Sequence, residues 1–406
     1  MRLPLSFAAL VLSTILLQLS SGTVAPLDAL AGIGAGFSTT QIGLLGSAHY
    51  LGFFAGCWWT PRLLGSIGPS RAYAAFTALG AIGLLAHTLV NDPYAWAVFR
   101  MATGVCVAGC YTVIEAWLQA DVTNESRGRA MGIYRVADLG TALVAQLLIG
   151  VLDPQSYVSY NLLAMVCCAA LLPLTLTTSR PPVMPATPRL EPGLAWRISP
   201  LAVAGVLTSA LSGASFRMVG PIYGQEVGLS ADRIAVFLAA YVAGGAAAQF
   251  PVGWLADRYD RRHVLIGLSA AAIAACTATA LMSDASPGTI YALAAFFGVT
   301  TFPIYSISAS HAHDFAESGQ RVALSAALMF WFAVGAIAAP YAASVLLGRY
   351  GPPALFILIG IGHVGLIVFG LARMQARPTT DDRTPYVYAP RTSFLVGRLL
   401  GRFRDR

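Results

Sequence analysis

Twelve apolar stretches, each of about 20 residues, constrain the fold of this chain more than any other feature of its sequence. A helix of that length crosses the hydrocarbon core of a bilayer, and it satisfies its own backbone hydrogen bonds there. The stretches cover residues 5–31, 41–60, 71–90, 94–118, 129–151, 157–177, 200–224, 232–254, 263–282, 288–310, 322–346 and 353–373. We therefore predict an all-α membrane protein with twelve transmembrane helices.

The charged residues exclude several classes of function. Only 11% of the residues are charged, against about 25% in soluble proteins. All 25 basic residues are arginines. Without lysine, the chain has no phosphate-binding loop of the Walker type, which excludes ATP-driven transport by this chain alone. The six cysteines lie inside apolar stretches without zinc-site spacing, so we expect no metal and no cofactor.

The arginines also predict the orientation of the chain. If the N-terminus lies in the cytoplasm, nearly all arginines outside the spans fall on the cytoplasmic side, and only Arg233 and Arg349 fall on the other. This is the positive-inside pattern of membrane proteins, and it explains the net charge of +7 without nucleic-acid binding. We expect both termini in the cytoplasm. The N-terminus resembles a signal peptide, but we interpret it as the first helix, because the repeat requires it.

An internal repeat relates the two halves of the sequence. Residues 38–43 (STTQIG) open the second predicted helix and residues 230–235 (SADRIA) open the eighth; the same offset places Gly52 on Gly244. An offset only two residues larger places Gly104 on Gly298, and likewise Tyr111 on Tyr305. Two six-helix halves of equal orientation predict two pseudo-symmetric bundles with a substrate path between them. The predicted parts are the first bundle at 1–178, a flexible linker at 179–199, the second bundle at 200–373 and a basic cytoplasmic tail at 374–406.

Residues 253–262 (GWLADRYDRR) resemble the loop signature of the major facilitator superfamily, with Asp260 in place of a usual glycine. Further likenesses to the YcaD-type bacterial branch lie around Thr23, Glu115 and Gly244. The resemblance implies this superfamily's fold and a transporter rather than an enzyme. It also implies a conformational latch formed by Gly253, Asp257, Arg258, Arg261 and Arg262; a plain positive-inside loop is the alternative. The first-half counterpart has Gly65 where Asp257 stands, so a symmetric latch is not expected.

Ionisable residues within the spans are functional candidates, because a charge in the bilayer is costly unless it is paired or hydrated. Glu115 lies in the fourth span, and Arg135 and Asp138 share a face of the fifth. Two acids sharing one arginine predict that one carboxyl stays protonated, as in a proton site. The alternative is a structural ion pair between two helices. Arg100 resembles an arginine of facilitator exporters and is a further proton-coupling candidate, or it extends to the outer interface.

Other candidates lie along the expected path. Arg217 and Asp28 form a candidate gate between the seventh and first helices. Six aromatic residues are candidates for the lining of the cavity: Tyr50, Tyr111, Tyr241, Tyr305, Phe330 and Trp331. The alternative for all six is packing between helices. His311, His313 and Asp314 end the tenth helix; two imidazoles two residues apart point in different directions, which does not suit one metal ion. Residues 393–404 alternate apolar and basic groups, which predicts either an interfacial helix or a disordered tail.

We therefore expect a secondary active transporter of small, amphiphilic organic solutes, coupled to protons and working by alternating access. Export is favoured over uptake. The expected setting is the bacterial cytoplasmic membrane, as a monomer, with a small-molecule substrate, protons and lipid as its partners. A membrane sensor that keeps the transporter fold without transport is the alternative, and an integral membrane enzyme is a remote one. The sequence does not name the substrate.

Overall fold

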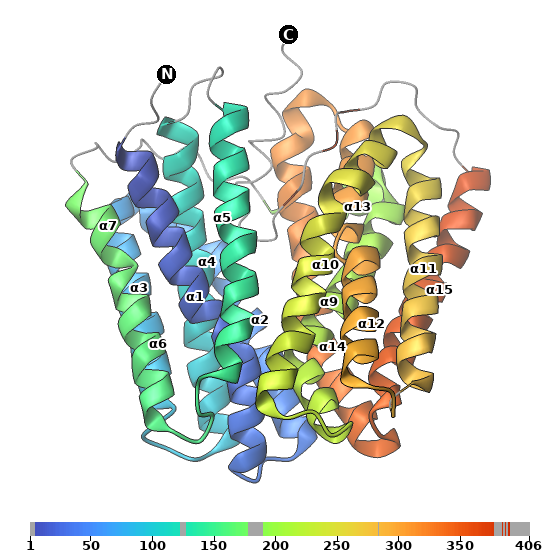
Figure 1. The fold of residues 1–406 in the computed structure, drawn as a ribbon. Helices are drawn as coiled ribbons and strands as arrows, with labels where there is room; N and C mark the ends of the chain where they lie inside the picture. Colours follow the sequence, from blue (N-terminus) through green and yellow to red (C-terminus); the bar gives the residue numbers. More distant parts are fainter. Residues whose placement is uncertain are drawn as a thin grey trace. The chain divides into compact units, whose positions relative to one another are not determined.

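The computed structural model describes residues 5–121, 127–177, 190–282 and 284–376 together with three tail residues, Thr384, Tyr386 and Ala389. All regular secondary structure within these ranges is helical, as Figure 1 shows. The chain divides into two compact units, Met1–Thr187 and Pro188–Arg406, which we call unit 1 and unit 2.

Unit 1 contains the first six predicted helices. Its elements are α1 (Leu5–Gly34), α2 (Thr39–Ile67), α3 (Pro69–Ala86), α4 (Pro93–Asp121), α5 (Arg127–Leu147), a 3₁₀ turn at Leu148–Gly150, α6 (Tyr157–Ala169) and α7 (Leu171–Leu176). The predicted helix 157–177 is divided into α6 and α7, because the ring of Pro173 clashes with the carbonyl of Ala169 in a continuous helix.

Unit 2 contains the other six. Its elements are α8 (Pro192–Ile198), α9 (Pro200–Glu226), α10 (Ala231–Arg258), α11 (Arg261–Leu281), α12 (Pro287–Thr301), α13 (Ile304–Asp314), a 3₁₀ turn at Ser318–Gln320, α14 (Arg321–Tyr350) and α15 (Pro353–Ala376). The predicted helix 288–310 is divided at Phe302 and Pro303, because proline lacks the N–H that a helix interior needs and restricts the residue before it.

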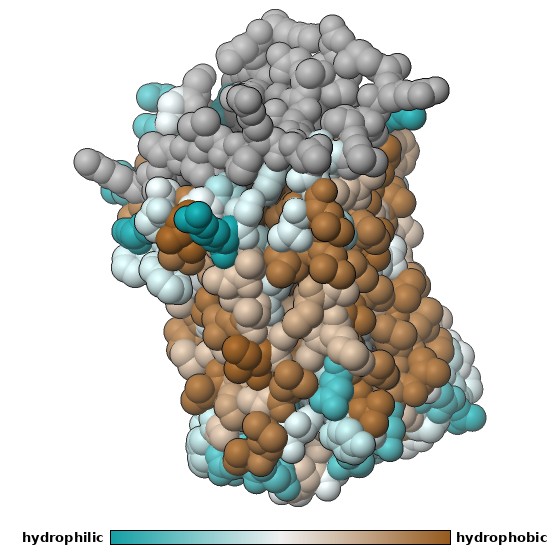
Figure 2. All heavy atoms as spheres, turned by 90° about the vertical axis from the view of Figure 1, so that its left-hand side faces the viewer, coloured by the Kyte–Doolittle hydropathy of each residue, from teal (hydrophilic) through white to brown (hydrophobic). Residues whose placement is uncertain are grey.

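These helices are suited to a bilayer. Ten spans in the described part of the chain are long and apolar enough to cross a membrane; α2 and α3 fall outside that set but are continuous helices of 29 and 18 residues. Figure 2 shows apolar side chains across the middle of one face and hydrophilic ones toward its ends. Large apolar side chains are exposed on α3, α6 and α7, among them Ile82, Met165 and Leu172. The prediction of an all-α membrane protein is confirmed.

One part of the predicted flexible linker is a helix instead. Residues 192–198 form α8, which packs on α14 within unit 2. The indole N–H of Trp331 donates to the carbonyl oxygen of Pro192 at 3.1 Å, and the rings of Trp196 and Trp331 lie 6.4 Å apart. The indole contacts and the proline at the first helical position stabilise this short helix.

Matching glycines bring helices into backbone contact in both units. In unit 1, a Cβ on Gly52 would lie 2.0 Å from the carbonyl oxygen of Met101, and one on Gly104 would lie 2.1 Å from that of His49. Only glycine therefore permits this approach of α2 and α4.

The same contact recurs in unit 2 between α10 and α12. A Cβ on Gly244 would lie 2.0 Å from the carbonyl oxygen of Ala295, and one on Gly298 would lie 2.0 Å from that of Tyr241. These glycines are the ones that the sequence repeat aligns with Gly52 and Gly104. The repeat therefore preserves a packing contact as well as a pattern of residues.

Candidate functional site

A buried ion pair joins α1 to α4 in unit 1. The guanidinium Nε of Arg100 lies 3.2 Å from Oδ2 of Asp28, and the two side chains are 2% and 0% exposed. The hydroxyl of Tyr160, on α6, donates to Oδ1 of Asp28 at 2.8 Å. A cation and a hydroxyl donor thus compensate the carboxylate, as a charge removed from water requires.

Aromatic rings enclose this pair. His87, directly after α3, has its Nε2 3.7 Å from Oδ2 of Asp28 and its Nδ1 2.7 Å from the carbonyl oxygen of Gly83. Its ring stacks on Tyr160, with centroids 5.2 Å apart, and meets Trp96 edge to face. We call Asp28, Arg100, His87, Tyr160 and Trp96 the Asp28 cluster. It connects four helical segments of unit 1.

The Asp28 cluster bears on two of the sequence interpretations. Arg100 is 2% exposed and paired, so it does not extend to an interface as one alternative held. The predicted gate between Asp28 and Arg217 would join the two units, and it stays a prediction; within unit 1 Asp28 already contacts Arg100 and Tyr160. Neither His87 nor Tyr160 was predicted from the sequence, although a histidine inside the apolar stretch 71–90 was a usable signal.

A second polar group lies between α1, α4 and α5. The hydroxyl oxygen of Tyr111 lies 2.6 Å from Oε1 of Gln18 and 2.8 Å from Oδ1 of Asp138. Tyr111 is 2% and Asp138 9% exposed. The structure therefore places Asp138 against a tyrosine that had been predicted only as cavity lining. Gln18, a polar residue in the middle of an apolar stretch, was missed.

The other two members of the predicted charged triad, Glu115 and Arg135, lie on the same helices, near Tyr111 and Asp138 in the sequence. Glu115 is 1% exposed and lies one helical turn from Tyr111 on α4. Arg135 is half-buried on α5, with its guanidinium carbon 5.8 Å from the ring centroid of Tyr134. A direct meeting of Glu115, Arg135 and Asp138 stays a prediction.

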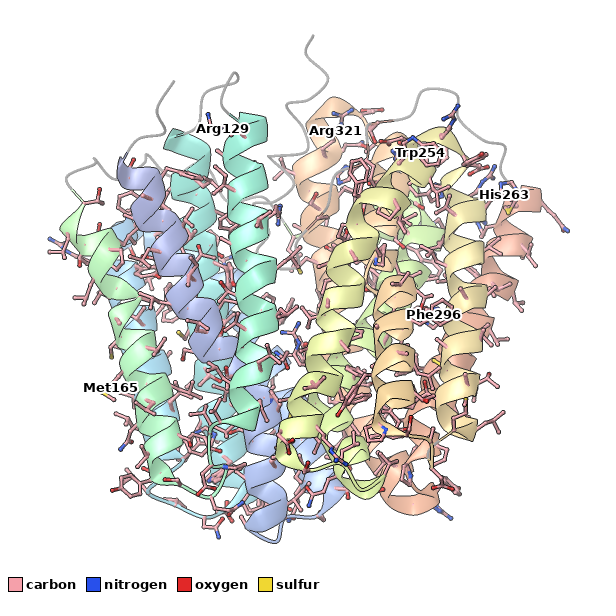
Figure 3. All side chains as sticks on the ribbon, in the orientation of Figure 1. Arg129, Met165, Trp254, His263, Phe296 and Arg321 are labelled. Carbon is pink, nitrogen blue, oxygen red and sulfur yellow. The ribbon has the colours of Figure 1, made fainter. Side chains whose placement is uncertain are left out.

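The predicted latch residues lie where α10 ends and α11 begins. Arg261 is 1% exposed, and its Nη1 lies 2.6 Å from Oδ1 of Asp314 at the end of α13. Its Nη2 lies 3.5 Å from Oδ1 of Asp257, a half-exposed carboxylate. Arg258 is exposed over the ring of Trp254. Figure 3 shows Trp254, His263 and Arg321 at this same end of unit 2.

Asp260, which stands where the superfamily signature has a glycine, is the N-cap residue of α11. Its carboxylate accepts hydrogen bonds from the backbone N–H of Arg262 at 3.0 Å and from Nη2 of the same side chain at 2.8 Å. Burial raises the pKa of Asp260, but these hydrogen bonds outweigh burial, so its pKa lies below the ordinary value. The substitution therefore supplies a helix cap, and Arg262 is held by Asp260 within the loop.

Most of the predicted lining residues contact side chains of their own unit. Tyr241 packs among Phe216, Phe297 and Phe302, and Tyr305 meets Phe332 edge to face. The half-buried residues are Tyr50, Phe330 and Trp331. These contacts favour the packing alternative for Tyr241 and Tyr305.

The chain matches the sequence profile described as Major Facilitator Superfamily twice, over residues 10–210 and 201–402. It is 26% identical over 353 residues to an uncharacterized MFS-type transporter of Enterobacter sp. (strain 638), covering 86% of this chain and 90% of that relative. It is also 26% identical over 349 residues to the uncharacterized MFS-type transporter YcaD of Escherichia fergusonii, covering 84% of this chain and 88% of YcaD.

Solved structures share the fold at low identity. The crystal structure of the nucleoside transporter NupG superposes with a TM-score of 0.73 at 14% identity, covering 93% of this chain and 100% of NupG. A bacterial homolog to the human lysosomal transporter Spinster, in an inward-facing and occupied conformation, superposes with a TM-score of 0.72 at 17% identity. That match covers 93% of this chain and 97% of the homolog.

Proposed function

The chain belongs to the major facilitator superfamily of membrane transporters, and on that premise we propose that it moves a small amphiphilic organic solute across the bacterial cytoplasmic membrane, driven by protons. The mechanism is alternating access along a path between the two halves, with both termini in the cytoplasm. The expected direction is export, because the sequence around Arg100 resembles a motif of facilitator exporters. The contact between Tyr111 and Asp138 carries the proposal of proton coupling.

A count of protons at Tyr111 is compatible with both protonation states of Asp138, as a proton carrier requires. A tyrosine hydroxyl donates only one hydrogen bond, yet its oxygen lies within 2.8 Å of oxygens of both Gln18 and Asp138. One of the two contacts therefore needs a proton from the other side. A protonated Asp138 provides it, as does a Gln18 amide turned by half a rotation. The site can therefore hold Asp138 either protonated or as a carboxylate, because the side-chain amide of Gln18 turns to match the hydrogen bond that Tyr111 makes.

The environment of Asp28 differs. Asp28 is 0% exposed and contacts the guanidinium of Arg100 at 3.2 Å. We assign proton transfer to Asp138, with Glu115, one turn from Tyr111, as the second carrier candidate, and a structural role within unit 1 to Asp28.

A solute must be identified before coupling can be measured. The likeness to NupG concerns the fold alone, so it gives no reason to favour nucleosides over other amphiphilic solutes. A thermal-shift screen of metabolites and drug-like amphiphiles on the purified protein identifies binders, because a ligand of the native state raises the unfolding temperature.

Flux in proteoliposomes then tests the proposal. We expect Asp138→Asn to abolish pH-gradient-driven accumulation while exchange of solute across the membrane without a gradient continues. Asp153→Asn, at an exposed loop carboxylate, is the matched control and should accumulate solute like the wild type. Gradient-driven accumulation retained in both Asp138→Asn and Glu115→Gln would refute the assignment and make Asp28 the next candidate. Binding without any flux in the wild-type protein would favour the sensor alternative.

A further inference from the structure

The C-terminal tail returns to unit 2 and contacts the loop that carries the latch residues. The backbone N–H and the hydroxyl of Thr384 both donate to Oδ1 of Asp314, at 2.8 and 2.9 Å. The guanidinium of Arg261 donates to the carbonyl oxygen of Thr384. Thr384 therefore completes the buried pair between Arg261 and Asp314, and both side chains of that pair are at most 3% exposed.

Tyr386 makes the second set of contacts. Its backbone N–H donates to Oδ1 of Asp257 at 2.6 Å, and its hydroxyl donates to Oε1 of Gln249 at 3.0 Å. Its ring lies so close to Gly253 that a Cβ there would be 2.6 Å from Cδ1 of the tyrosine. Gly253, a glycine of the superfamily signature, thus leaves the space that the ring fills.

A cluster of apolar side chains contacts this ring. Tyr386 packs against a buried cluster whose members come from α9, α10, α11, α13 and α15 and include Leu201, Val252, Ala256 and Ile307. Farther along the tail, the backbone N–H of Ala389 donates to Oγ of Ser306 at 3.2 Å, and Ala389 is 4% exposed. Three tail residues therefore contact α10, α11 and α13 through hydrogen bonds and one half-buried ring.

The chemistry of these contacts is that of peptide recognition. Four backbone groups of the tail are bonded by side chains of unit 2: the N–H groups of Thr384, Tyr386 and Ala389 and the carbonyl of Thr384. Backbone hydrogen bonds supply affinity and a pocket for one side chain supplies specificity, as in other peptide grooves. The short connection from Ala376 to Thr384 gives the segment a high effective concentration at the groove.

We propose that the groove formed by α10, α11 and α13 is a docking site for the chain's own C-terminal segment around Tyr386, and that the docked segment is a releasable clasp on these three helices. Docking occupies Asp257, the carboxylate of the latch. A partner that draws the tail away therefore frees Asp257 and loosens the ends of α10 and α13 in one step. The proposal does not depend on the coupling ion or the solute.

Disulfide trapping in the full-length chain tests the docking. Gly253→Cys combined with Tyr386→Cys places two thiols where the ring now meets the glycine, within the reach of a disulfide. Cys168, the exposed cysteine of the described residues, is replaced by alanine. We expect mild oxidation to close this pair about tenfold faster than Gly253→Cys with Ser393→Cys, because a docked segment presents position 386 at a far higher local concentration. Equal rates for the two pairs would overturn the proposal.

Amide hydrogen exchange tests the clasp. Tyr386→Ala should increase exchange at the ends of α10 and α13, whereas Tyr386→Phe, which keeps the ring and the backbone donors, should stay close to wild type. Gly253→Leu should reproduce the effect of Tyr386→Ala from the groove side, because leucine fills the space of the ring. Gly267→Leu, at a glycine of α11 with no neighbour within 4 Å, is its control. Unchanged exchange in both Tyr386→Ala and Gly253→Leu would show that the segment does not hold these helices.

Discussion

Asp28 and Arg100 are both removed from solvent, and each compensates the charge of the other. Asp28→Asn leaves the guanidinium of Arg100 buried with a neutral partner, which costs about 3–5 kcal/mol in comparable buried pairs. We expect a large fall in the unfolding temperature of the purified protein.

A double-mutant cycle separates the interaction energy of Asp28 with Arg100 from the other effects of each substitution. Asp28→Asn with Arg100→Gln removes both charges, so its cost should be clearly less than the sum of the two single costs. Asp153→Asn, at a surface carboxylate, should leave the unfolding temperature unchanged. Additive costs in the double variant would mean that the ion pair contributes nothing specific to stability.

Single residues were the hardest to place from the sequence. Cost arguments selected Asp28, Arg100, Asp138 and Glu115 as functional candidates, because an ionisable residue in an apolar stretch is conspicuous; all four are buried, and their roles stay predictions. Their partners were not predictable. Asp28 meets an arginine three helices away, and the rotation of each helix about its axis decides which faces meet; the sequence had suggested Arg217 instead.

At the scale of helices, the glycines of α2 and α4 provide a direct test of packing. A valine at Gly52 would place its side chain against the carbonyl of Met101, so the two helices must separate. Forced overpacking typically costs about 1–3 kcal/mol, and we expect Gly52→Val to lower the unfolding temperature.

The control is a helical glycine in open space. Gly128, in α5, has no neighbour within 4 Å, so Gly128→Ala should be neutral or slightly stabilising. Gly244→Val, at the equivalent contact in unit 2, should behave like Gly52→Val. A neutral Gly52→Val would show that the close approach of α2 and α4 is not required.

Helix starts were predicted within two residues because their local signals are strong, whereas the end of α2, predicted at residue 60, lies at Ile67. Prolines at the first helical position begin α3, α9 and α12, and Gly68 and Gly351 adopt positive φ where helices end. The helix α8 was not predicted, because seven residues in a proline-rich segment carry no periodicity to detect. Its stability comes from Trp331, a contact that only the tertiary structure supplies.

For the whole molecule, the orientation in the membrane is the prediction to test. The arginine pattern places both termini in the cytoplasm, so reporter fusions after residues 153, 284 and 349 should report the external side. Fusions at residue 376, where α15 ends, should report the cytoplasm. A cytoplasmic signal at any of the first three positions would contradict the orientation.

The tail was also beyond prediction from the sequence. Residues 374–406 were predicted as a basic tail, and the possible interfacial helix at 393–404 lies outside the described residues. The docking of Tyr386 depends on backbone N–H donors, which every residue except proline carries. No residue type in the sequence therefore predicts it. The only usable signal was the tyrosine itself in a polar segment.

The glycine contacts also have a mechanical consequence. Helices α2 and α4 are in backbone contact at Gly52 and Gly104, so they bend as one unit. Two helices packed in this way resist bending far more than a single helix does. Both α1 and α2 contain an interior proline, Pro26 and Pro61, which removes a backbone hydrogen bond and lowers local stiffness; in α2 the glycine contact with α4 opposes this effect. Bending of α1 should therefore concentrate near Pro26, two residues from Asp28, so that flexing of α1 strains the Asp28 cluster directly.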